Sequence, residues 1–415
     1  MNNLRILYSS NAIWATSGYG VQGKSLLPRL AELASVGGRQ NIAQFAWYGL
    51  QGGIHEWEGF KIYPCGVDPY GNDIIQSHTK HFGANVVISL IDAWVMQQVG
   101  QKVKPALWLP WLPIDHDPVP QKVVDAIADA YLPLTYSKWG SEMLNKLGIQ
   151  NYYIPHGIEP SVFKILDPEV VEQFKAQYLK HDGHLTIMVA ANKGYPDRKN
   201  FQGQLAAWAN FAKNKPDAKL YLHTEPTPLY QGLNLPQLCQ HLGIADKVMF
   251  PERYEYFIGL PAEYLAYIYN SANVLMAAAM SEGFGIPIIE AQACGTPVIT
   301  TNFSAMPELV RYGNIIDVER MVWTLLEAYQ AVPNQDQITE ALEENYQSWV
   351  DSGKQKNLNA GIKASQAIQA EYNWDELVNT HWKPLFENLH TKIFNTSKPV
   401  IQPSVNTTKS GKIIP

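Results

Sequence analysis

Two glutamates, Glu282 and Glu290, stand with seven residues between them in the segment SEGFGIPIIEAQACGTPVITT, residues 281–301. Ionised carboxylates only accept hydrogen bonds, so two of them on one short segment suit the hydroxyl groups of a sugar and of a ribose. Gly283 and Gly285 follow the first glutamate and would let a ligand approach the backbone closely. The alternative is an ordinary strand-to-helix turn with a solvated Glu282 and a salt-bridged Glu290, and the pattern alone does not separate the two.

The elements around these glutamates predict one unit of a parallel sheet. The apolar run 272–279 predicts a buried strand, residues 286–293 a helix, and residues 298–301 the next strand. A proline near the helix start and a glycine after its end are the usual helix boundaries. Free amides at a helix start attract phosphate, and Glu290, one turn in, can reach back toward them. We therefore expect a site for an anionic, hydroxyl-rich ligand.

Basic residues follow another predicted strand, 185–190. Lys193, Arg198 and Lys199 lie in the loop between this strand and a helix predicted over 201–214. Cationic side chains near a helix start suit a diphosphate, and an arginine can bind it bidentately. A solvated basic loop is the alternative.

The N-terminal segment has a similar order of elements. A short strand, 4–8, leads into SSNAIWATSGYG, in which Gly18 and Gly20 precede a helix predicted over 21–34. The third glycine of a dinucleotide fingerprint is missing, and no acidic residue ends the next strand. The pattern disfavours a nicotinamide cofactor, while a loop that covers a phosphate or a sugar stays compatible.

A third group of polar residues, Asp115, His116 and Asp117, lies in the proline-bounded loop 110–120 after a strand predicted at 106–109. Such loops at strand ends often carry the working residues of α/β proteins. Three interpretations stay open: His116 handles a hydrogen bond or a proton in a cleft, the three residues bind a metal, or the flanking aspartates simply hold the histidine. The metal lacks a completing set of ligands nearby.

The composition describes a globular protein of about two domains. The chain has 415 residues, 17% of them charged, and a net charge of −6, which gives no electrostatic sign of nucleic-acid binding. Three widely spaced cysteines fit a reducing cytosol without a disulfide framework. The first residues predict a strand rather than a signal peptide, and no apolar run approaches 18 residues. We expect a cytoplasmic protein, with a peripheral position at a membrane left open.

Taken in order, these motifs resemble the retaining glycosyltransferases of family 4, which have the GT-B fold. The segment 281–301 is similar to the family's E-x7-E segment in its glutamates, its GFG glycines and its CGTPVI run. The supporting motifs follow the family's order between residues 4 and 310: the GYG of 18–20, His116, the HGIE turn at 155–159, and the RKN of 198–200.

The resemblance implies an α/β fold of two Rossmann-like domains facing across a cleft. The expected parts are an N-terminal acceptor-side domain at 1–163, a linker at 164–184, a nucleotide-sugar-binding domain at 185–352, C-terminal helices at 353–394 that pack back on the first domain, and a flexible tail at 395–415. Beyond residue 310 the pattern predicts mostly helices, beginning with one at 318–331.

The resemblance also implies roles for single residues. Glu290 would hold the ribose hydroxyls, and Glu282 would hold the transferred sugar together with the amides of Phe284 and Gly285. His116 would touch that sugar near the reacting carbon. Arg198 and Lys199 would neutralise the diphosphate. Further donor contacts would come from Gly18, Tyr19, Gly20, Lys193, Gly283, Phe284, Gly285 and Ile286. Lys193 departs from the family, which usually has an arginine near that position, so it can supply charge but no bidentate contact.

The implied reaction moves a hexose from a UDP- or GDP-sugar with retention of configuration and without a metal or other cofactor. Cations and amides would stabilise the leaving nucleoside diphosphate, and its phosphate can accept the acceptor's proton. The pair Asp115-x-Asp117 resembles the metal-binding D-x-D of the other large glycosyltransferase fold, but its surroundings belong to the metal-independent one. A nucleotide-sugar hydrolase or a phosphorylase-like enzyme on the same fold is the alternative, and a non-enzymatic binding module is disfavoured by the intact set of polar residues.

The acceptor is not specified by the sequence. The first domain contains tryptophans that could stack a sugar, a base or a polyprenyl group, among them Trp14, Trp47, Trp94, Trp108 and Trp111, although core packing explains most of them equally well. The acidic balance counts against DNA, and only Lys24 and Arg29 suggest a basic face for a lipid. A saccharide, a lipid-linked acceptor, a protein and a modified nucleobase all stay open, as does the oligomeric state.

Overall fold

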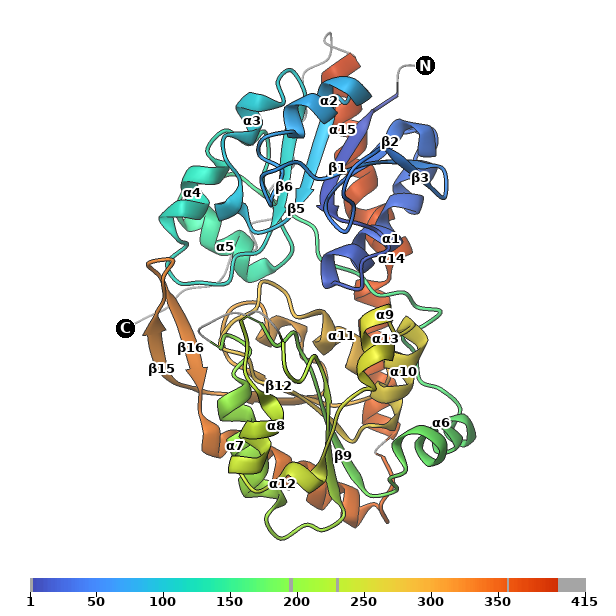
Figure 1. The fold of residues 1–415 in the computed structure, drawn as a ribbon, viewed down its shortest axis with the longest axis vertical. Helices are drawn as coiled ribbons and strands as arrows, with labels where there is room; N and C mark the ends of the chain where they lie inside the picture. Colours follow the sequence, from blue (N-terminus) through green and yellow to red (C-terminus); the bar gives the residue numbers. More distant parts are fainter. Residues whose placement is uncertain (1–2, 194–196, 229–230, 357, 395–415) are drawn as a thin grey trace, which may run out of the picture.

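The computed structural model describes residues 3–193, 197–228, 231–356 and 358–394. Figure 1 shows two α/β domains stacked along the long axis of the molecule, as the sequence predicts. The expected tail at 395–415 lies outside the described residues.

The first domain is built on an eight-stranded sheet of order β3-β4-β2-β1-β5-β6-β7-β8, in which only β3 runs antiparallel to its neighbour. Its central strands are buried throughout and read as near-continuous apolar runs, as expected for a parallel sheet covered on both faces. The strands are β1 (Ile6–Asn11), β2 (Ile42–Tyr48), β3 (His55–Trp57), β4 (Phe60–Tyr63), β5 (Val86–Leu90), β6 (Leu107–Leu112), β7 (Leu134–Thr135) and β8 (Tyr152–Tyr153). The helices are α1 (Gly18–Glu32), α2 (Ile75–Phe82), α3 (Val99–Lys102), α4 (Gln121–Ile127) and α5 (Lys138–Lys146).

The second domain has a six-stranded parallel sheet of order β11-β10-β9-β12-β13-β14. Its strands are β9 (His184–Val189), β10 (Ala218–His223), β11 (Val248–Met249), β12 (Val274–Ala277), β13 (Val298–Thr301) and β14 (Gly313–Ile316). Its helices are α6 (Pro168–Phe174), α7 (Phe201–Ala212), α8 (Leu235–His241), α9 (Arg253–Ile258), α10 (Ala262–Ser271), α11 (Ile286–Ala293) and α12 (Gln335–Asp351). Because β9 and β12 are adjacent at the centre of the sheet, the loops after them meet at its carboxyl edge, where open α/β sheets bind ligands.

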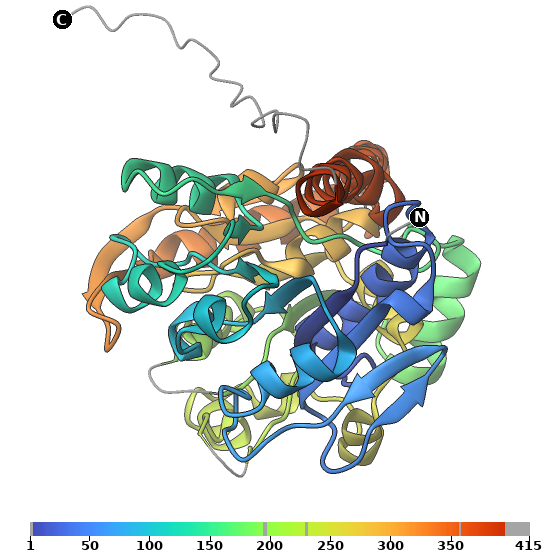
Figure 2. The ribbon, with the colours of Figure 1, turned by 90° about the horizontal axis from the view of Figure 1, so that it is seen from above.

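Of the last helices, α13 (Leu358–Tyr372) packs on α11 of the second domain, unlike the prediction that all of 353–394 packs on the first domain. The chain then returns to the first domain with α14 (Trp374–Leu377) and α15 (Lys383–Phe394). Trp382, in the turn before α15, packs edge-on against Trp111 of β6, with the ring centroids 5.2 Å apart. Figure 2, seen from above, shows these helices beside the N-terminal elements. One apolar core therefore joins residues of both domains and of the C-terminal segment.

The prediction of a helix at 318–331 is wrong. This stretch forms an antiparallel hairpin of β15 (Val318–Trp323) and β16 (Tyr329–Pro333), which Figure 1 shows at the side of the molecule. Tertiary pairing overrides the helical spacing of its apolar residues, because Tyr329 exchanges two backbone hydrogen bonds with Asp117 of the first domain. Ala331 also donates to the carbonyl of Met280, just before Glu282. The hairpin thus connects the His116 loop with the Glu282 loop.

Within the described ranges, no helix is long and apolar enough to cross a membrane. All three cysteines are free.

Candidate active site

Glu282 lies between two cations at the carboxyl edge of the second sheet. Its Oε2 accepts a hydrogen bond from Nη1 of Arg198 at 3.1 Å, and its Oε1 is bound by Nζ of Lys199. Arg198 also donates to the carbonyl of Ser281 at 2.6 Å. The two basic residues come from the loop after β9 and the glutamate from the loop after β12. The structure therefore brings Glu282 together with two adjacent basic residues that lie more than 80 positions before it in the sequence.

This cluster is strongly coupled. Burial alone would raise the pKa of Glu282, but the cations Lys199 and Arg198 hold it below its usual range. Burial lowers the pKa of Lys199, against the opposing effect of Glu282, whereas Glu282 and Asp115 overcome burial and raise the pKa of Arg198. Two basic side chains thus face one carboxylate in this cluster, which favours an anionic ligand.

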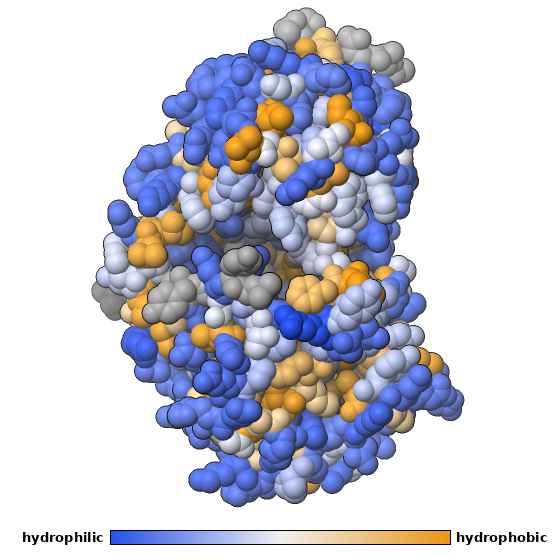
Figure 3. Space-filling model, viewed as in Figure 1, coloured by the Kyte–Doolittle hydropathy of each residue, from blue (hydrophilic) through white to orange (hydrophobic). Residues whose placement is uncertain are grey.

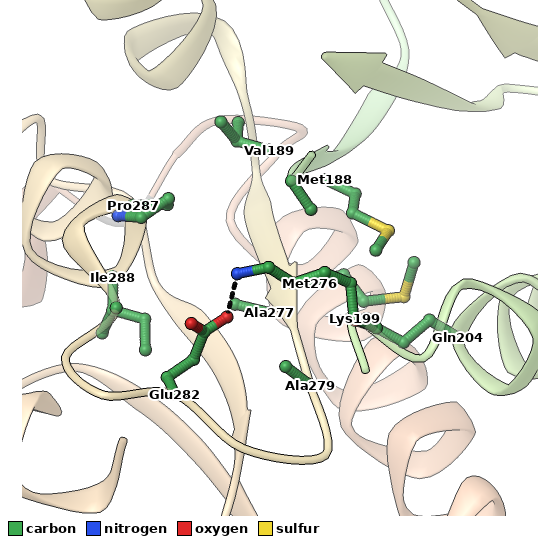
Figure 4. Close-up of a pocket in the computed structure, with 12 residues that line it drawn as sticks. Met188, Val189, Lys199, Gln204, Met276, Ala277, Ala279, Glu282, Pro287 and Ile288 are labelled. Carbon is green, nitrogen blue, oxygen red and sulfur yellow. Dashed lines mark hydrogen bonds and ion pairs between the residues drawn. The ribbon is translucent and has the colours of Figure 1, made fainter. Parts of the chain in front are cut away.

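A pocket with an empty volume of about 310 Å³ opens beside Glu282. Figure 4 shows the Glu282 carboxylate directed at Lys199 across this pocket, with two methionines on the strand side and the start of α11 opposite. Figure 3 shows a recess at the junction of the two domains on one face of the molecule. The lining is mostly apolar with few polar groups: Met188, Met276, Pro287, Ile288, Lys199, Gln204 and Glu282 are among its residues.

The start of α11 borders the same pocket. Gly285 is the N-cap in a left-handed conformation, φ 108°, which a glycine adopts without strain. Within the described part of the chain, the amides of Phe284, Gly285 and Ile286 donate to no acceptor. Unpaired amides at a helix start can bind anions or other hydrogen-bond acceptors, so these three amides are available to a ligand in the pocket.

Glu290 lies one turn deeper on α11 and does not line the pocket. It is buried, and its Oε2 accepts a hydrogen bond from the hydroxyl of Tyr269 at 3.0 Å. Burial raises the pKa of Glu290 to about 7. The two glutamates of the motif thus have different environments, one paired with cations and the other with a phenol. The Tyr269 contact carries no signal in the sequence, because it joins two helices.

On the first-domain side, His116 is buried and its Nδ1 lies 2.7 Å from Oδ1 of Asp115. This contact is expected from the interpretation in which the flanking aspartates simply hold the histidine. Burial alone would raise the pKa of Asp115, but the hydrogen bond with His116 lowers it, helped by the charges of Arg198 and Lys199. The His116 loop therefore faces the cations of the second domain, as a role in the cleft requires.

The N-terminal glycines belong to the first turn of α1, not to the loop before the helix. Ser17 is the N-cap and accepts a hydrogen bond from the amide of Gly20 at 3.2 Å. A Cβ on Gly20 would lie 2.3 Å from the carbonyl oxygen of Ala15, so this glycine serves close backbone packing. A Cβ on Gly18 would lie 3.9 Å from Cδ1 of Ile286, so Gly18 faces the start of α11. The hydroxyl of Tyr19 lies 3.4 Å from that of Tyr136.

Gly283 and Phe284 lie at the junction of the domains. A Cβ on Gly283 would lie 2.4 Å from Cβ of Pro113, so only a glycine permits this approach. The ring of Phe284 packs against His156 at 5.4 Å and against Tyr136 at 6.4 Å. For Phe284 only the amide is available to a ligand, because the side chain fills the interface.

Asp92, at the end of β5, is a cleft residue that the sequence reasoning did not single out. Burial raises its pKa to about 6, with Asp115 adding to the effect and Arg198 and Lys193 opposing it. Lys193 is exposed, and its charge acts on Asp92 across the cleft. An acid directly after a buried central strand was the available signal.

Glu308 joins the two domains through hydrogen bonds to a helix start. Its carboxylate accepts from the amides of Lys138 at 2.9 Å and Trp139 at 3.0 Å, in the first turn of α5. We expect Glu308→Ala to lower the free energy of unfolding by about 1–3 kcal/mol, because two charge-assisted bonds are lost. Chemical denaturation measures this change. Glu319→Ala, at an exposed ion pair with Arg320, is the control, and equal losses in both variants would contradict the assignment.

No group of three or more histidine, cysteine or acidic side chains in the described ranges is placed to hold a metal ion.

Comparisons with known proteins agree with this geometry. Residues 171–356 match the family model described as glycosyl transferases group 1. A D-inositol 3-phosphate glycosyltransferase of Segniliparus rotundus is 34% identical over 110 residues, which are 26% of this chain and 22% of that protein. The match thus spans about a fifth of the relative's own length.

Solved structures are similar over nearly the whole chain. Sucrose-phosphate synthase from Thermosynechococcus elongatus has a TM-score of 0.70 and 19% identity, covering 95% of this chain and 100% of that one. Anabaena Alr3699/HepE, solved in complex with UDP and glucose, has a TM-score of 0.64 and 13% identity, covering 93% and 100%. The fold is therefore that of GT-B glycosyltransferases.

Proposed function

We propose that this protein is a glycosyltransferase that moves a hexosyl group from a nucleotide-diphosphate sugar, a UDP- or GDP-sugar, with retention of configuration. The observation that carries the proposal is the position of Arg198, Lys199 and Glu282 beside the free amides at the start of α11. Cations and amides on one side and a carboxylate on the other match the two ends of such a donor, a diphosphate and a sugar. The match to group 1 glycosyl transferases over residues 171–356 supports it.

In this proposal the diphosphate lies between the basic loop and the start of α11. Arg198 and Lys199 exchange part of their contact with Glu282 for phosphate oxygens, and Lys193 adds charge at the cleft mouth. The amides of Phe284, Gly285 and Ile286 donate to the same phosphates. Glu290 accepts hydrogen bonds from the ribose, and Glu282 from the hexose, because ionised carboxylates are acceptors only.

The chemical step is the breaking of the bond between the sugar and the diphosphate. Negative charge develops on the leaving phosphate, and preorganised cations and amides stabilise it more than the ground state. The phosphate oxygen takes the proton of the attacking acceptor hydroxyl, so no strong protein base is needed. His116, held by Asp115, contributes a ring nitrogen near the sugar.

We propose that the reaction needs no metal ion. Support comes from the charge already present, since Arg198 and Lys199 supply the two positive charges that a divalent cation would bring to a diphosphate. Without a donor, Glu282 neutralises one of these two positive charges. When the sugar binds to Glu282, it displaces part of the contact between Glu282 and the two basic side chains.

A panel of nucleotide-diphosphate sugars, incubated with the protein and a chelator and analysed by mass spectrometry, tests this function. We expect one donor to be consumed slowly, at a rate that the chelator leaves unchanged. Its sugar passes to water because no acceptor is supplied, and its nucleoside diphosphate is released. Free sugar formed as fast as any transfer would favour a nucleotide-sugar hydrolase instead. Binding and consumption of no donor in the panel would contradict the proposal.

A further inference from the structure

Tyr269 and Glu290 form an isolated buried pair. Tyr269 lies on α10 and is fully buried, and its hydroxyl donates to Oε2 of Glu290 at 3.0 Å. The second oxygen, Oε1, accepts no hydrogen bond within the described part of the chain. It is not fully enclosed by protein atoms. One oxygen of this carboxylate is therefore fixed, while the other is open to a ligand.

The backbone of Tyr269 is itself held from behind. The hydroxyl of Thr296 donates to the carbonyl of Tyr269 at 2.6 Å, and Nζ of Lys356 lies 2.6 Å from Oγ1 of Thr296. Lys356 also reaches the carbonyls of Tyr269 and Cys294, at 3.4 Å each. These bonds join the ends of α10 and α11 and fix the backbone from which the Tyr269 side chain extends toward Glu290.

We propose that Tyr269 is a positioning residue for donor binding: its hydroxyl orients the Glu290 carboxylate so that Oε1 faces the ribose hydroxyls. The inference rests on the proposed function, since Glu290 is the residue given to the ribose. Tyr269 itself does not touch the donor, but it determines how well Glu290 binds the ribose. A carboxylate without this hydrogen bond would lose rotamer freedom when it binds the ribose, at a cost in binding free energy. The carboxylate held by Tyr269 has lost that freedom already.

The pair also makes donor binding depend on pH. Burial raises the pKa of Glu290 to about 7, and the Tyr269 bond acts in the opposite direction. The facing groups are Tyr269 from α10 and Cys294 from the end of α11, and burial keeps both neutral near pH 7. Behind Cys294, burial lowers the pKa of Lys356 to about 8. Because an ionised carboxylate accepts hydrogen bonds from the ribose hydroxyls more strongly than a neutral carboxyl group does, affinity should fall below the pKa of Glu290, by at most about tenfold per pH unit.

Tyr269→Phe tests the inference, because it removes only the hydroxyl. We expect the Kd for UDP or GDP, whichever binds, to rise about tenfold at pH 7, since a hydrogen bond to a charged group is lost. The midpoint of the pH profile should move upward, because the bond favours the ionised form. Tyr264→Phe is the matched control: it lies on the same helix, and its hydroxyl bonds with Tyr221. Calorimetric titration across pH 5–9 measures both quantities.

Glu290→Gln completes the test, because it removes the titrating carboxyl group. The pH dependence of binding that remains in this variant is that of the diphosphate itself. In the Gln variant we expect the added Tyr269→Phe change to leave the pH profile unmoved. Equal Kd values and equal midpoints for Tyr269→Phe and Tyr264→Phe would overturn the inference while leaving the proposed function standing. Failure of every form, including the unsubstituted protein, to bind a nucleoside diphosphate would instead remove the proposed function.

Discussion

Lys199→Ala should lower kcat/KM for the nucleotide-sugar donor by roughly 10²–10³-fold, the size of effect seen when one preorganised donor of charge is removed from a transition state. Nζ of Lys199 is bound to Glu282 in the pocket and lies where the leaving phosphate gains charge. The loss should fall mainly on kcat, because the negative charge is greater in the transition state than in the bound donor. Steady-state kinetics on the donor found by the panel measure it.

Lys213→Ala is the matched control for this variant. Lys213 is exposed at the far end of α7, the helix that begins just after Lys199, so the same charge is removed away from the pocket. We expect kinetic constants within twofold of the unsubstituted protein and an unchanged melting temperature. A loss of kcat in Lys213→Ala as large as that in Lys199→Ala would show that net charge, not position, matters.

Glu282→Gln should abolish transfer and at the same time tighten the binding of the free nucleoside diphosphate. In the structure, Glu282 occupies both Arg198 and Lys199, so a diphosphate must compete with it. A glutamine keeps the shape but not the charge, which leaves the two cations for the phosphates. We expect kcat to fall at least about 100-fold, because the amide is a poor acceptor for the hexose hydroxyls.

The tightening is the discriminating part of this prediction. Calorimetric titration should give a lower Kd for the diphosphate in Glu282→Gln than in the unsubstituted protein, opposite to the change in Lys199→Ala. The variant should also unfold at a lower temperature without ligand, since two partly buried cations lose their partner. Weaker diphosphate binding in a folded Glu282→Gln protein would contradict the view that Glu282 and the phosphates share these cations.

The sequence predicted the parts of the site that depend on local chemistry. The helix expected at 286–293 is α11 with the same bounds, and the strand expected at 298–301 is β13. Gly285 and the proline after it mark the helix start in a way that needs no tertiary information. The position of the basic loop could be predicted because the loop follows a mostly apolar run, LTIMVA at 185–190, which forms most of β9.

The parts that failed depend on contacts between distant residues. The hairpin at 318–333 has the apolar spacing of a helix, but its hydrogen bonds go to Asp117 and Met280, which no local pattern specifies. Gly20 was expected to bring a loop against the donor, but it lies inside the first turn of α1, where the carbonyls of Ala12 and Ala15 leave no room for a Cβ. Tyr269 and Asp92 gain their altered pKa values from burial, which also follows only from the packed fold.

A crystal structure with a bound nucleoside diphosphate is the most direct test of the donor site. We expect phosphate oxygens within hydrogen-bond distance of Arg198, Lys199 and the amides of 284–286, and ribose hydroxyls on Oε1 of Glu290. Density for the diphosphate at any other place, with Glu282 still bound to both cations, would contradict this expectation.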